Sequence, residues 1–399
     1  GRQQALMRGA GRRVAITGYG VVAPCGIGRE AFWDGLNGPG ITDSRTVSVQ
    51  NWDPLPYYDN PKEARRADRS EQFAVAAAME AFEHAGQVSV DKSRFGTIYA
   101  TGVGGLRSTE EQIGVMLDKG ERRVSPFLVP MMMANAAGAA ISMRYGLRGP
   151  NETVCTACAA STHALGYAAR LIAWDMADAV ASGGTESANC AIGIASFGNM
   201  TALSSSGHSS PFDASRDGFV LGEGAAVFIL EAYDLAEARG ATILAEVLGA
   251  ASNADAHHIT APSPGGVGAI ACMRLALDDA GLDPSQIVQV NAHGTSTPLN
   301  DAAEAAALTE VFGPFGVPVT STKGVTGHAL GAAGALELAA LLGSFEHRQI
   351  PRTANTTQPD DGMTIDLVTG SARDFTPGPS MSNNFGFGGH NGSIIIAPV

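Results

Sequence analysis

The sequence has few charged residues, few aromatic residues and no long apolar run. Only 16% of its 399 residues are charged and 6% are aromatic, whereas 45% are hydrophobic. This apolar content is enough for a large buried core, which excludes a largely disordered chain. A membrane-spanning helix needs about 18 or more consecutive apolar residues. Because the sequence contains no such run, we expect no membrane association.

Basic residues are also scarce. Lys and Arg total 26 against 39 for Asp and Glu, so the formal net charge is −13. Proteins that bind nucleic acid use Lys and Arg to neutralise phosphates, so we do not expect nucleic acid as a partner. Residues 1–13 are basic but lack the apolar segment of a secretory signal, so we do not expect them to direct secretion.

Cysteines are few, odd in number and irregularly spaced. This pattern predicts reduced thiols in a cytoplasmic protein rather than a disulfide framework. The five cysteines are Cys25, Cys155, Cys158, Cys190 and Cys272.

A faint internal repeat is the main sign of how the chain is organised. Three pairs of similar segments occur in the same order in the two parts of the chain. The pairs are 76–86 with 271–281, 163–174 with 328–339, and 218–230 with 386–398. The two segments of the first pair lie further apart in the chain than those of the other two pairs. This difference indicates an insertion in the first half of the chain, and residues 107–135 fit that insertion.

The repeat predicts two halves of similar structure, 13–240 and 241–399. Each half alternates apolar strands with apolar-periodic helices, which is typical of an α/β fold with a central sheet. Sites in such folds lie at strand ends, where equivalent loops of the two halves converge. The segment GYGVVA at 18–23 is a weak dinucleotide-binding pattern, and a simple turn explains it better.

The Cys-x-x-Cys at Cys155 and Cys158 is open to several interpretations. A redox pair or half of a zinc site would use both thiols, but no second pair of ligands follows. Cys158 begins a predicted helix, where the helix dipole and free N–H groups favour a thiolate. Cys155 ends the preceding apolar strand, where a buried, inert thiol is expected. We therefore weigh Cys158 as a single nucleophile against a structural role.

Two histidines follow predicted strands in the second half. His293 lies in the loop NAHGTSTP, and His328 begins a small-residue helix that matches the helix after Cys158 in the repeat. If the halves face each other, Cys158 and His328 meet. Lys323, just upstream, is placed to hold a carboxylate or to orient a histidine. The glycine-rich segment 383–391 is suited to present N–H groups to an oxyanion, although a plain hairpin turn explains it as well.

Several motifs together resemble one family. TACAAS, SPFDASRDGFVLGEG, NAHGTSTPLNDAAE, STKGVTGHALGAAGALE and NNFGFGGHNGS occur in this order. They resemble the elongating Cys-His-His class of β-ketoacyl-acyl-carrier-protein synthases, which belong to the thiolase superfamily and act in type II fatty-acid and polyketide synthesis. The resemblance implies a thiolase-type α/β fold, with two duplicated halves in five αβαβα layers.

The resemblance also implies the reaction, a decarboxylative Claisen condensation of an acyl thioester with malonyl-acyl carrier protein that gives a 3-oxoacyl-acyl carrier protein. Cys158 would carry the acyl group, and His293 and His328 would hold the malonyl thioester carbonyl. Lys323 and Glu337 would support the histidines. The resemblance implies no required metal or other cofactor. The substrates themselves are carried on the phosphopantetheine of an acyl carrier protein.

Further roles are implied for residues around the nucleophile. The N–H groups of Cys158 and Phe387 would form an oxyanion hole, and Phe387 would also gate the acyl pocket. Thr295 and Thr297 would contact the phosphopantetheine arm, and Phe385 would contribute to substrate binding.

The resemblance implies an acyl carrier protein and a second subunit as partners, in a homodimer or a heterodimer with a paralogue. Ser210 stands where the family has an Arg that faces the carrier. Arg65, Arg66 and Arg69 are therefore our candidates for a carrier-binding patch.

Three other activities were weighed. A type II polyketide ketosynthase with a chain-length-factor partner fits the same motifs. A non-catalytic chain-length factor is disfavoured because Cys158 is present. A degradative thiolase is disfavoured because the C-terminal turn has His390 and no second cysteine.

Overall fold

A computed structural model describes residues 11–399 of the chain. Most of the basic N-terminal segment considered above therefore lies outside the described residues. Within residues 11–399, no helix is both long and apolar enough to cross a membrane.

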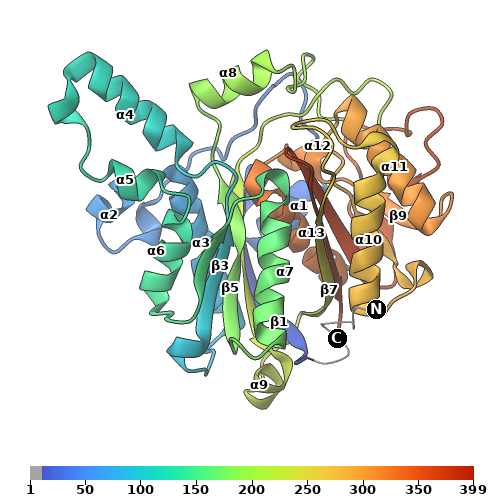
Figure 1. Ribbon diagram of the computed structural model, residues 1–399, viewed down its shortest axis with the longest axis horizontal. Helices are drawn as coiled ribbons and strands as arrows, with labels where there is room; N and C mark the ends of the chain where they lie inside the picture. The colour runs from blue at the N-terminus through green and yellow to red at the C-terminus, as the bar shows by residue number, and fades with distance from the viewer. Residues whose placement is uncertain (1–10) are drawn as a thin grey trace.

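The strands join in one twisted, mixed sheet (Figure 1). Its order is β11-β9-β8-β13-β14-β7-β1-β6-β5-β3-β4, with β2 paired to β1. The strands of this sheet are β1 (Val14–Ala23), β2 (Gly26–Ile27), β3 (Phe95–Ala100), β4 (Asn151–Val154), β5 (Ala179–Glu186), β6 (Gly224–Ala232), β7 (Ala245–Ala254), β8 (Gln289–Asn291), β9 (Pro318–Thr320), β11 (Asp366–Leu367), β13 (Ser380–Gly386) and β14 (His390–Ala397). A separate two-stranded sheet contains β10 (Gln349–Ile350) and β12 (Arg373–Asp374).

The sheet has two parts that meet at β1 and β7. The first part runs from β1 through β6, β5 and β3 to the edge strand β4, and the second runs from β7 to β11. Only three residue pairs, Val14–Ile16 against 245–247, join β1 to β7. Because this junction is short, other contacts must hold the two parts together.

The helices cover the sheet on its outer faces and fill its interior. They are α1 (Arg29–Leu36), α2 (Pro61–Arg65), α3 (Arg69–Ala85), α4 (Leu106–Lys119), α5 (Leu128–Met132), α6 (Ala136–Tyr145), α7 (Ala160–Ala173), α8 (Ala191–Asn199), α9 (Tyr233–Ala238), α10 (Val267–Ala280), α11 (Pro298–Phe312), α12 (Lys323–Thr326) and α13 (Ala333–His347). Helices α3 and α6 pack on the first part of the sheet, and α10 packs on β7 and β14 of the second part. The first matched pair of the repeat falls at equivalent places, because its last residues, Gly86 and Gly281, are the C-caps of α3 and α10.

Helices α7 and α13 lie between the two parts of the sheet. Helix α7 contacts β3 and β5 on one side and β7 and β14 on the other, while α13 contacts β1, β5, β6 and β13. Every residue of α13 from Ala333 to Phe345 is buried. Small side chains allow this close packing: a Cβ on Gly331, just before α13, would lie 2.1 Å from the Gly102 nitrogen. This packing places the loops before α7 and α13 side by side.

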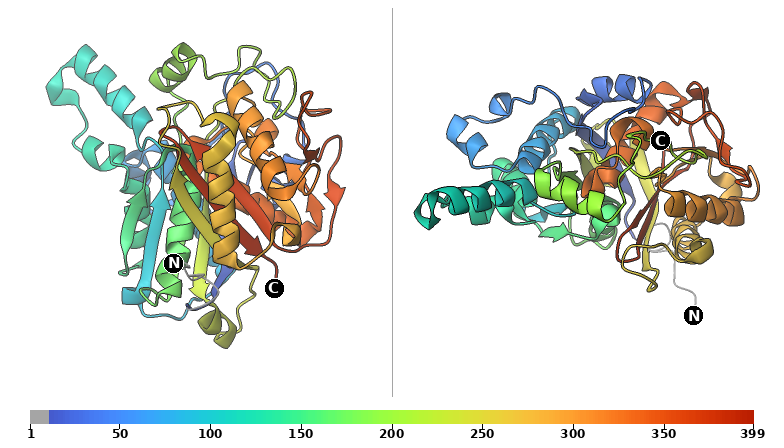
Figure 2. Two further views of the ribbon diagram at one scale, coloured as in Figure 1. Left: turned by 45° about the vertical axis from the view of Figure 1, so that its right-hand side comes forward. Right: turned by 90° about the horizontal axis from the view of Figure 1, so that it is seen from above.

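The segment 107–135 forms most of α4 and α5, which project from the body of the protein as an arm (Figures 1 and 2). Several of its large apolar side chains are exposed, including Leu117 at 79% and Val129 at 61%.

Candidate active site

Cys158 lies in a tight turn between the edge strand β4 and helix α7. The turn is a single 3₁₀ turn, Ala157–Ala159, so the α-helix itself begins two residues later than the sequence predicted. Ala157 has φ 53°, which a non-glycine residue rarely adopts. The turn packs against the β13–β14 hairpin, where a Cβ on Gly386 would lie 2.9 Å from the Cys158 nitrogen. Glycine is therefore required at position 386.

The Cys158 thiol is neutral at neutral pH, and the expectation of a favoured thiolate is wrong. Burial raises its pKa to about 12, because an apolar site disfavours the charged sulfur. The charge of Lys323 and the N–H groups of Phe387 and Cys158 lower this pKa, but burial outweighs them. The sequence predicted the helix start to within two residues, but it did not indicate how deeply the thiol is buried.

Cys155, which the sequence predicted to be buried, is exposed. It follows β4, and β4 is the edge strand of the sheet, so neighbouring structure covers only one side of it. Its sulfur contacts the Gly102 carbonyl oxygen at 3.2 Å.

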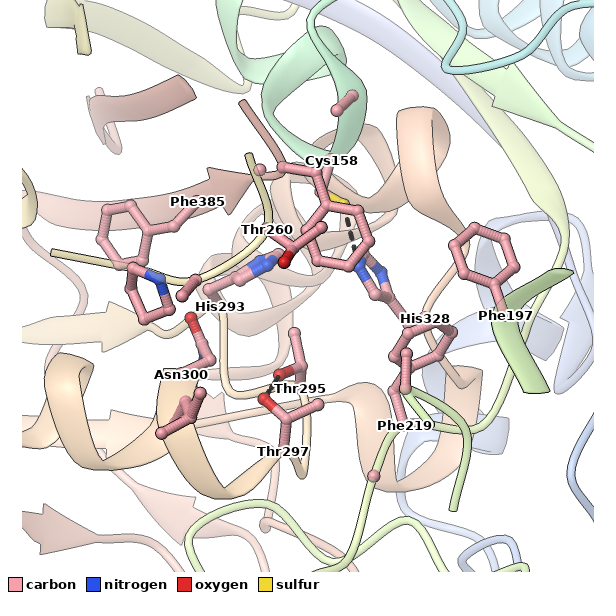
Figure 3. A pocket seen from close by; sticks show the side chains of 18 of the residues that line it. Cys158, Phe197, Phe219, Thr260, His293, Thr295, Thr297, Asn300, His328 and Phe385 are labelled. Atoms are coloured by element: carbon pink, nitrogen blue, oxygen red, sulfur yellow. Dashed lines mark hydrogen bonds between the residues drawn. The ribbon is translucent and has the colours of Figure 1, made fainter. Parts of the chain in front are cut away.

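His328 is in direct contact with the nucleophile. Its Nε2 lies 3.1 Å from Cys158 Sγ, across the junction that the repeat predicted (Figure 3). Its ring meets the ring of Phe219 edge to face, with centroids 5.1 Å apart. Burial and the charge of Lys323 hold the pKa of His328 well below its usual value, so the imidazole is neutral.

His293 is held as a neutral hydrogen-bond donor. The Asn384 amide nitrogen lies 3.2 Å and the Lys323 ammonium 3.4 Å from its Nδ1. Both groups are donors, so Nδ1 accepts and the ring proton resides on Nε2. Burial first, and then the charges of Lys323 and His328, lower the pKa of His293 well below its usual value. The rings of His293 and His328 are 5.2 Å apart.

A buried ion pair supports His293 from behind. The Lys323 ammonium contacts Glu337 at 2.5 Å and the His293 carbonyl oxygen at 2.7 Å. Asn384 donates to both oxygens of Glu337 at 3.2 and 3.3 Å, and Thr162 donates to the Asn384 oxygen. Burial raises the pKa of Glu337, and the adjacent Lys323 opposes that shift. Lys323 thus both holds a carboxylate and orients a histidine.

The sequence analysis missed Glu304 and Phe219. Glu304 is buried in α11 and accepts the backbone N–H groups of His293 and Gly294, each at 2.7 Å. Burial raises the pKa of Glu304 to about 8, although these N–H groups oppose the shift. The only sequence signal was an acidic residue in the second turn of the helix after the His293 loop.

Cys158, His293 and His328 face a cavity of about 480 Å³. In Figure 3, Phe197 and Phe219 lie beside His328, and Phe385 lies beside His293. Thr295 and Thr297 also line the cavity, with their hydroxyl oxygens 2.8 Å apart. The cavity is also lined by Cys158 and Phe387.

The sulfur of Cys158 and one ring nitrogen from each of the two histidines lie within 4.8 Å of one another. Such a set has the donor types of a metal site. His328 contacts both of the other groups, since its Nε2 lies 3.1 Å from Cys158 Sγ and its ring centroid 5.2 Å from that of His293.

None of the three candidate arginines, Arg65, Arg66 and Arg69, lines this cavity. Their surroundings also differ. Arg65 and Arg66 are exposed, and the Arg66 guanidinium lies 4.0 Å above the ring of Phe127 in the arm. Arg69 instead turns inward and pairs with buried Glu223 at 2.7 Å. Ser210 is buried, and its backbone N–H donates to Ser296.

The raised pKa of Cys158 predicts how its reactivity changes with pH. Below a pKa of about 12, the thiolate fraction rises about tenfold for each pH unit. We expect the rate of Cys158 alkylation by iodoacetamide to rise by about that factor per unit from pH 7 to 9. Peptide mass spectrometry separates Cys158 from exposed Cys155. A rate at Cys158 that stays constant over this range would mean that a thiolate–imidazolium pair already exists, and would contradict the assignment.

Comparisons with known proteins agree with this geometry. Residues 40–236 match the beta-ketoacyl synthase N-terminal domain, and residues 244–357 match the beta-ketoacyl synthase C-terminal domain. A 3-oxoacyl-[acyl-carrier-protein] synthase 2 of Synechocystis sp. is 40% identical over 407 residues, covering 96% of this chain and 98% of that protein.

Solved ketosynthases have the same mixed α/β fold. The ishigamide ketosynthase/chain length factor structure aligns with a TM-score of 0.92 and 32% identity, covering 98% of this chain and 100% of that chain. A ketosynthase bound to its type II polyketide acyl-carrier protein and a hexaketide aligns with a TM-score of 0.89 and 31% identity, with the same coverage. The chain belongs to the beta-ketoacyl synthase family.

Proposed function

We propose that this chain joins an acyl group to malonyl-acyl carrier protein with loss of CO₂, giving a 3-oxoacyl-acyl carrier protein in fatty-acid elongation. The observation that carries this proposal is the contact between a buried cysteine and two neutral histidines at one cavity. A thiol is suited to hold the acyl group as a thioester, and two N–H donors in a dry site are suited to stabilise an enolate.

In the first step, the Cys158 thiol loses its proton to water, and the sulfur attacks the thioester carbonyl of the acyl carrier. The N–H groups of Cys158 and Phe387, which lower the pKa of the thiol, hold the resulting oxyanion. When the intermediate collapses, the carbon–sulfur bond to the carrier breaks, and the carrier leaves as its thiolate and takes up a proton from water. The acyl group then lies on Cys158.

In the second step, the malonyl thioester carbonyl accepts hydrogen bonds from His293 and His328. The bond to the carboxylate breaks, CO₂ leaves, and its electron pair forms an enolate whose oxygen the two histidines stabilise. The enolate carbon attacks the acyl-Cys158 carbonyl, and collapse releases the 3-oxoacyl product and the Cys158 thiolate, which takes up a proton. Burial, together with the charge of Lys323, keeps both imidazoles neutral, so that they act as donors without a full charge.

The remaining predicted residues fit this sequence of steps. Thr295 and Thr297 lie along the cavity where a phosphopantetheine arm would enter, and Phe385 packs beside His293. Phe387 combines its backbone role with that of a gate to the acyl pocket.

We further propose that the fold is of the thiolase type, with the halves 13–240 and 241–399. Helices α7 and α13 between two sheet parts, with α3 and α6 on one outer face and α10 on the other, support five αβαβα layers. The matched positions of α7 and α13 support the duplication.

A type II polyketide ketosynthase is the second candidate, since one solved neighbour is a type II polyketide ketosynthase and another is described as a ketosynthase/chain length factor. Fatty-acid elongation is favoured because the synthase 2 relative is more similar, at 40% against 31–32% identity. A non-catalytic chain-length-factor role is disfavoured by the intact contact of Cys158 with His328.

Substitutions at the site separate the two steps. Cys158→Ala should abolish condensation, because no thiol remains to hold the acyl group. His293→Ala or His328→Ala should slow CO₂ release from malonyl carrier at least about tenfold, since each removes an enolate donor. Product formation and CO₂ release are measured in parallel, and normal condensation by Cys158→Ala would refute the mechanism.

We propose that Arg65 and Arg66 contribute to the docking surface for the acidic carrier. Both are exposed, whereas the inward pairing of Arg69 with Glu223 supports a structural role for Arg69. Exposed charges attract a partner weakly, and each pair contributes about 0.2–1 kcal/mol.

Charge reversal tests this surface. Arg65→Glu with Arg66→Glu should raise the KM for carrier-bound substrates about three- to tenfold and leave kcat within about twofold, with a smaller effect at high salt. Arg148→Glu, an exposed arginine after α6, is the control. Equal KM values for the double variant and the control would remove Arg65 and Arg66 from the docking surface.

A second subunit, either a copy of this chain or a paralogue, is the remaining proposed partner. The exposed apolar side chains of the α4–α5 arm and the open edge of β4 support this proposal, because large exposed apolar patches mark interaction surfaces.

A further inference from the structure

We propose that His163 is a positioning residue that fixes the spacing of the two N–H groups beside the nucleophile. The inference rests on the proposed acyl transfer at Cys158. Those N–H groups belong to Cys158, before α7, and to Phe387, in the β13–β14 hairpin. They come from segments far apart in the chain, so their spacing depends on what ties the two segments together.

His163 forms one such tie through both ring nitrogens. It lies in the first turn of α7, where its Nδ1 is 2.8 Å from the Thr156 hydroxyl oxygen. Its Nε2 is 2.8 Å from the Asn391 carbonyl oxygen. A carbonyl can only accept, so Nε2 carries the proton, and Nδ1 accepts from the Thr156 hydroxyl. One neutral imidazole therefore bridges the nucleophile turn and the hairpin.

The two ends of this bridge lie close to the reacting atoms. Thr156 is two residues before Cys158, and Asn391 is four residues after Phe387. The ring is also packed tightly against β14, since a Cβ on Gly392 would lie 3.0 Å from His163 Cδ2. Burial, the largest cause, together with nearby His390 and Arg170, lowers the pKa of His163 and keeps it neutral.

The far end of the bridge is itself anchored. The Asn391 amide nitrogen donates to Asn253 at 3.0 Å and to Asp255 at 2.8 Å. The hairpin is thus fixed on one side to β7 and the loop after it. On the other side it is fixed to α7 by two side chains, since Thr162 donates to Asn384 of β13 and His163 reaches β14. Loss of His163 would remove the one of these two ties that also holds Thr156, two residues before Cys158.

The two histidines that begin the matched segments HALGYAARLIAW and HALGAAGALELA differ in position and in contacts. His163 is the fourth residue of α7, whereas His328 lies five residues before α13, so the expectation that His328 begins a helix is wrong. His328 contacts the thiol, whereas His163 uses both nitrogens in contacts with Thr156 and Asn391.

If the spacing between the N–H groups of Cys158 and Phe387 is no longer fixed, acyl transfer should slow, while substrate binding should not weaken. Removing one oxyanion donor costs about 10²–10³ in rate, and a displacement of about 1 Å can cost about 10². We expect His163→Phe to lower kcat for acylation and condensation about ten- to a hundredfold, with the carrier KM within about twofold. Decarboxylation of malonyl carrier, which uses His293 and His328, should stay within about threefold.

A second variant separates hydrogen bonding from packing. His163→Gln keeps a donor that reaches the Asn391 carbonyl, whereas His163→Phe keeps the ring volume but no polar atom. We expect Gln to retain more acyl-transfer activity than Phe. His84→Gln, a half-buried histidine in the last turn of α3, is the matched control for a general loss of stability, and Thr156→Val removes the other end of the bridge.

Each outcome decides for or against the bridge. Wild-type rates in His163→Phe, or more activity in Phe than in Gln, would overturn it. Equal losses of acylation and decarboxylation, with a lowered melting temperature, would indicate a merely structural role and would also overturn it. If one variant does not fold, the acylation-to-decarboxylation ratio of Thr156→Val decides. Failure of the wild-type protein to acquire an acyl group on Cys158 would instead refute the proposed function.

Discussion

The buried ion pair between Lys323 and Glu337 is the interaction on which the site depends. Both side chains are almost fully buried, at 1% and 2% exposure. Removing one partner of such a pair costs about 3–5 kcal/mol, because the other charge is left uncompensated. The pair links α12 to α13, and through Asn384 and the His293 loop it reaches β13 and the end of β8. The charge therefore ties together the elements that position the histidines.

Burial and the same charge determine how the site works chemically. Burial, and then the ammonium of Lys323, lower the pKa values of both imidazoles, so His293 is neutral and presents Nε2–H to the cavity. The thiol is neutral too, because burial outweighs the groups that favour its thiolate. The site thus consists of neutral, preoriented donors around a deeply buried sulfur, an arrangement that stabilises negative charge only where it develops during reaction.

Much of this could be predicted from the sequence, because the repeat carries three-dimensional information. The match between the segments beginning at His163 and His328 predicted that loops of the two halves meet, and Cys158 does contact His328. Burial could not be predicted in the same way. Cys155 is exposed because β4 is an edge strand, and Arg69 turns inward to a glutamate 154 residues away. Glu304 was missed because its partners are backbone N–H groups. Every residue except proline has such a group, so no residue type in the sequence indicates the contact.

Every step of the proposed reaction depends on Cys158 carrying the acyl group. The direct test is the intact mass of the protein after incubation with a panel of acyl-carrier thioesters, followed by peptide mapping. We predict a single added acyl group on Cys158, with none on exposed Cys155, and saturated acyl chains among the accepted donors. An unmodified protein with every donor, or an acyl group on any other residue, would contradict this prediction.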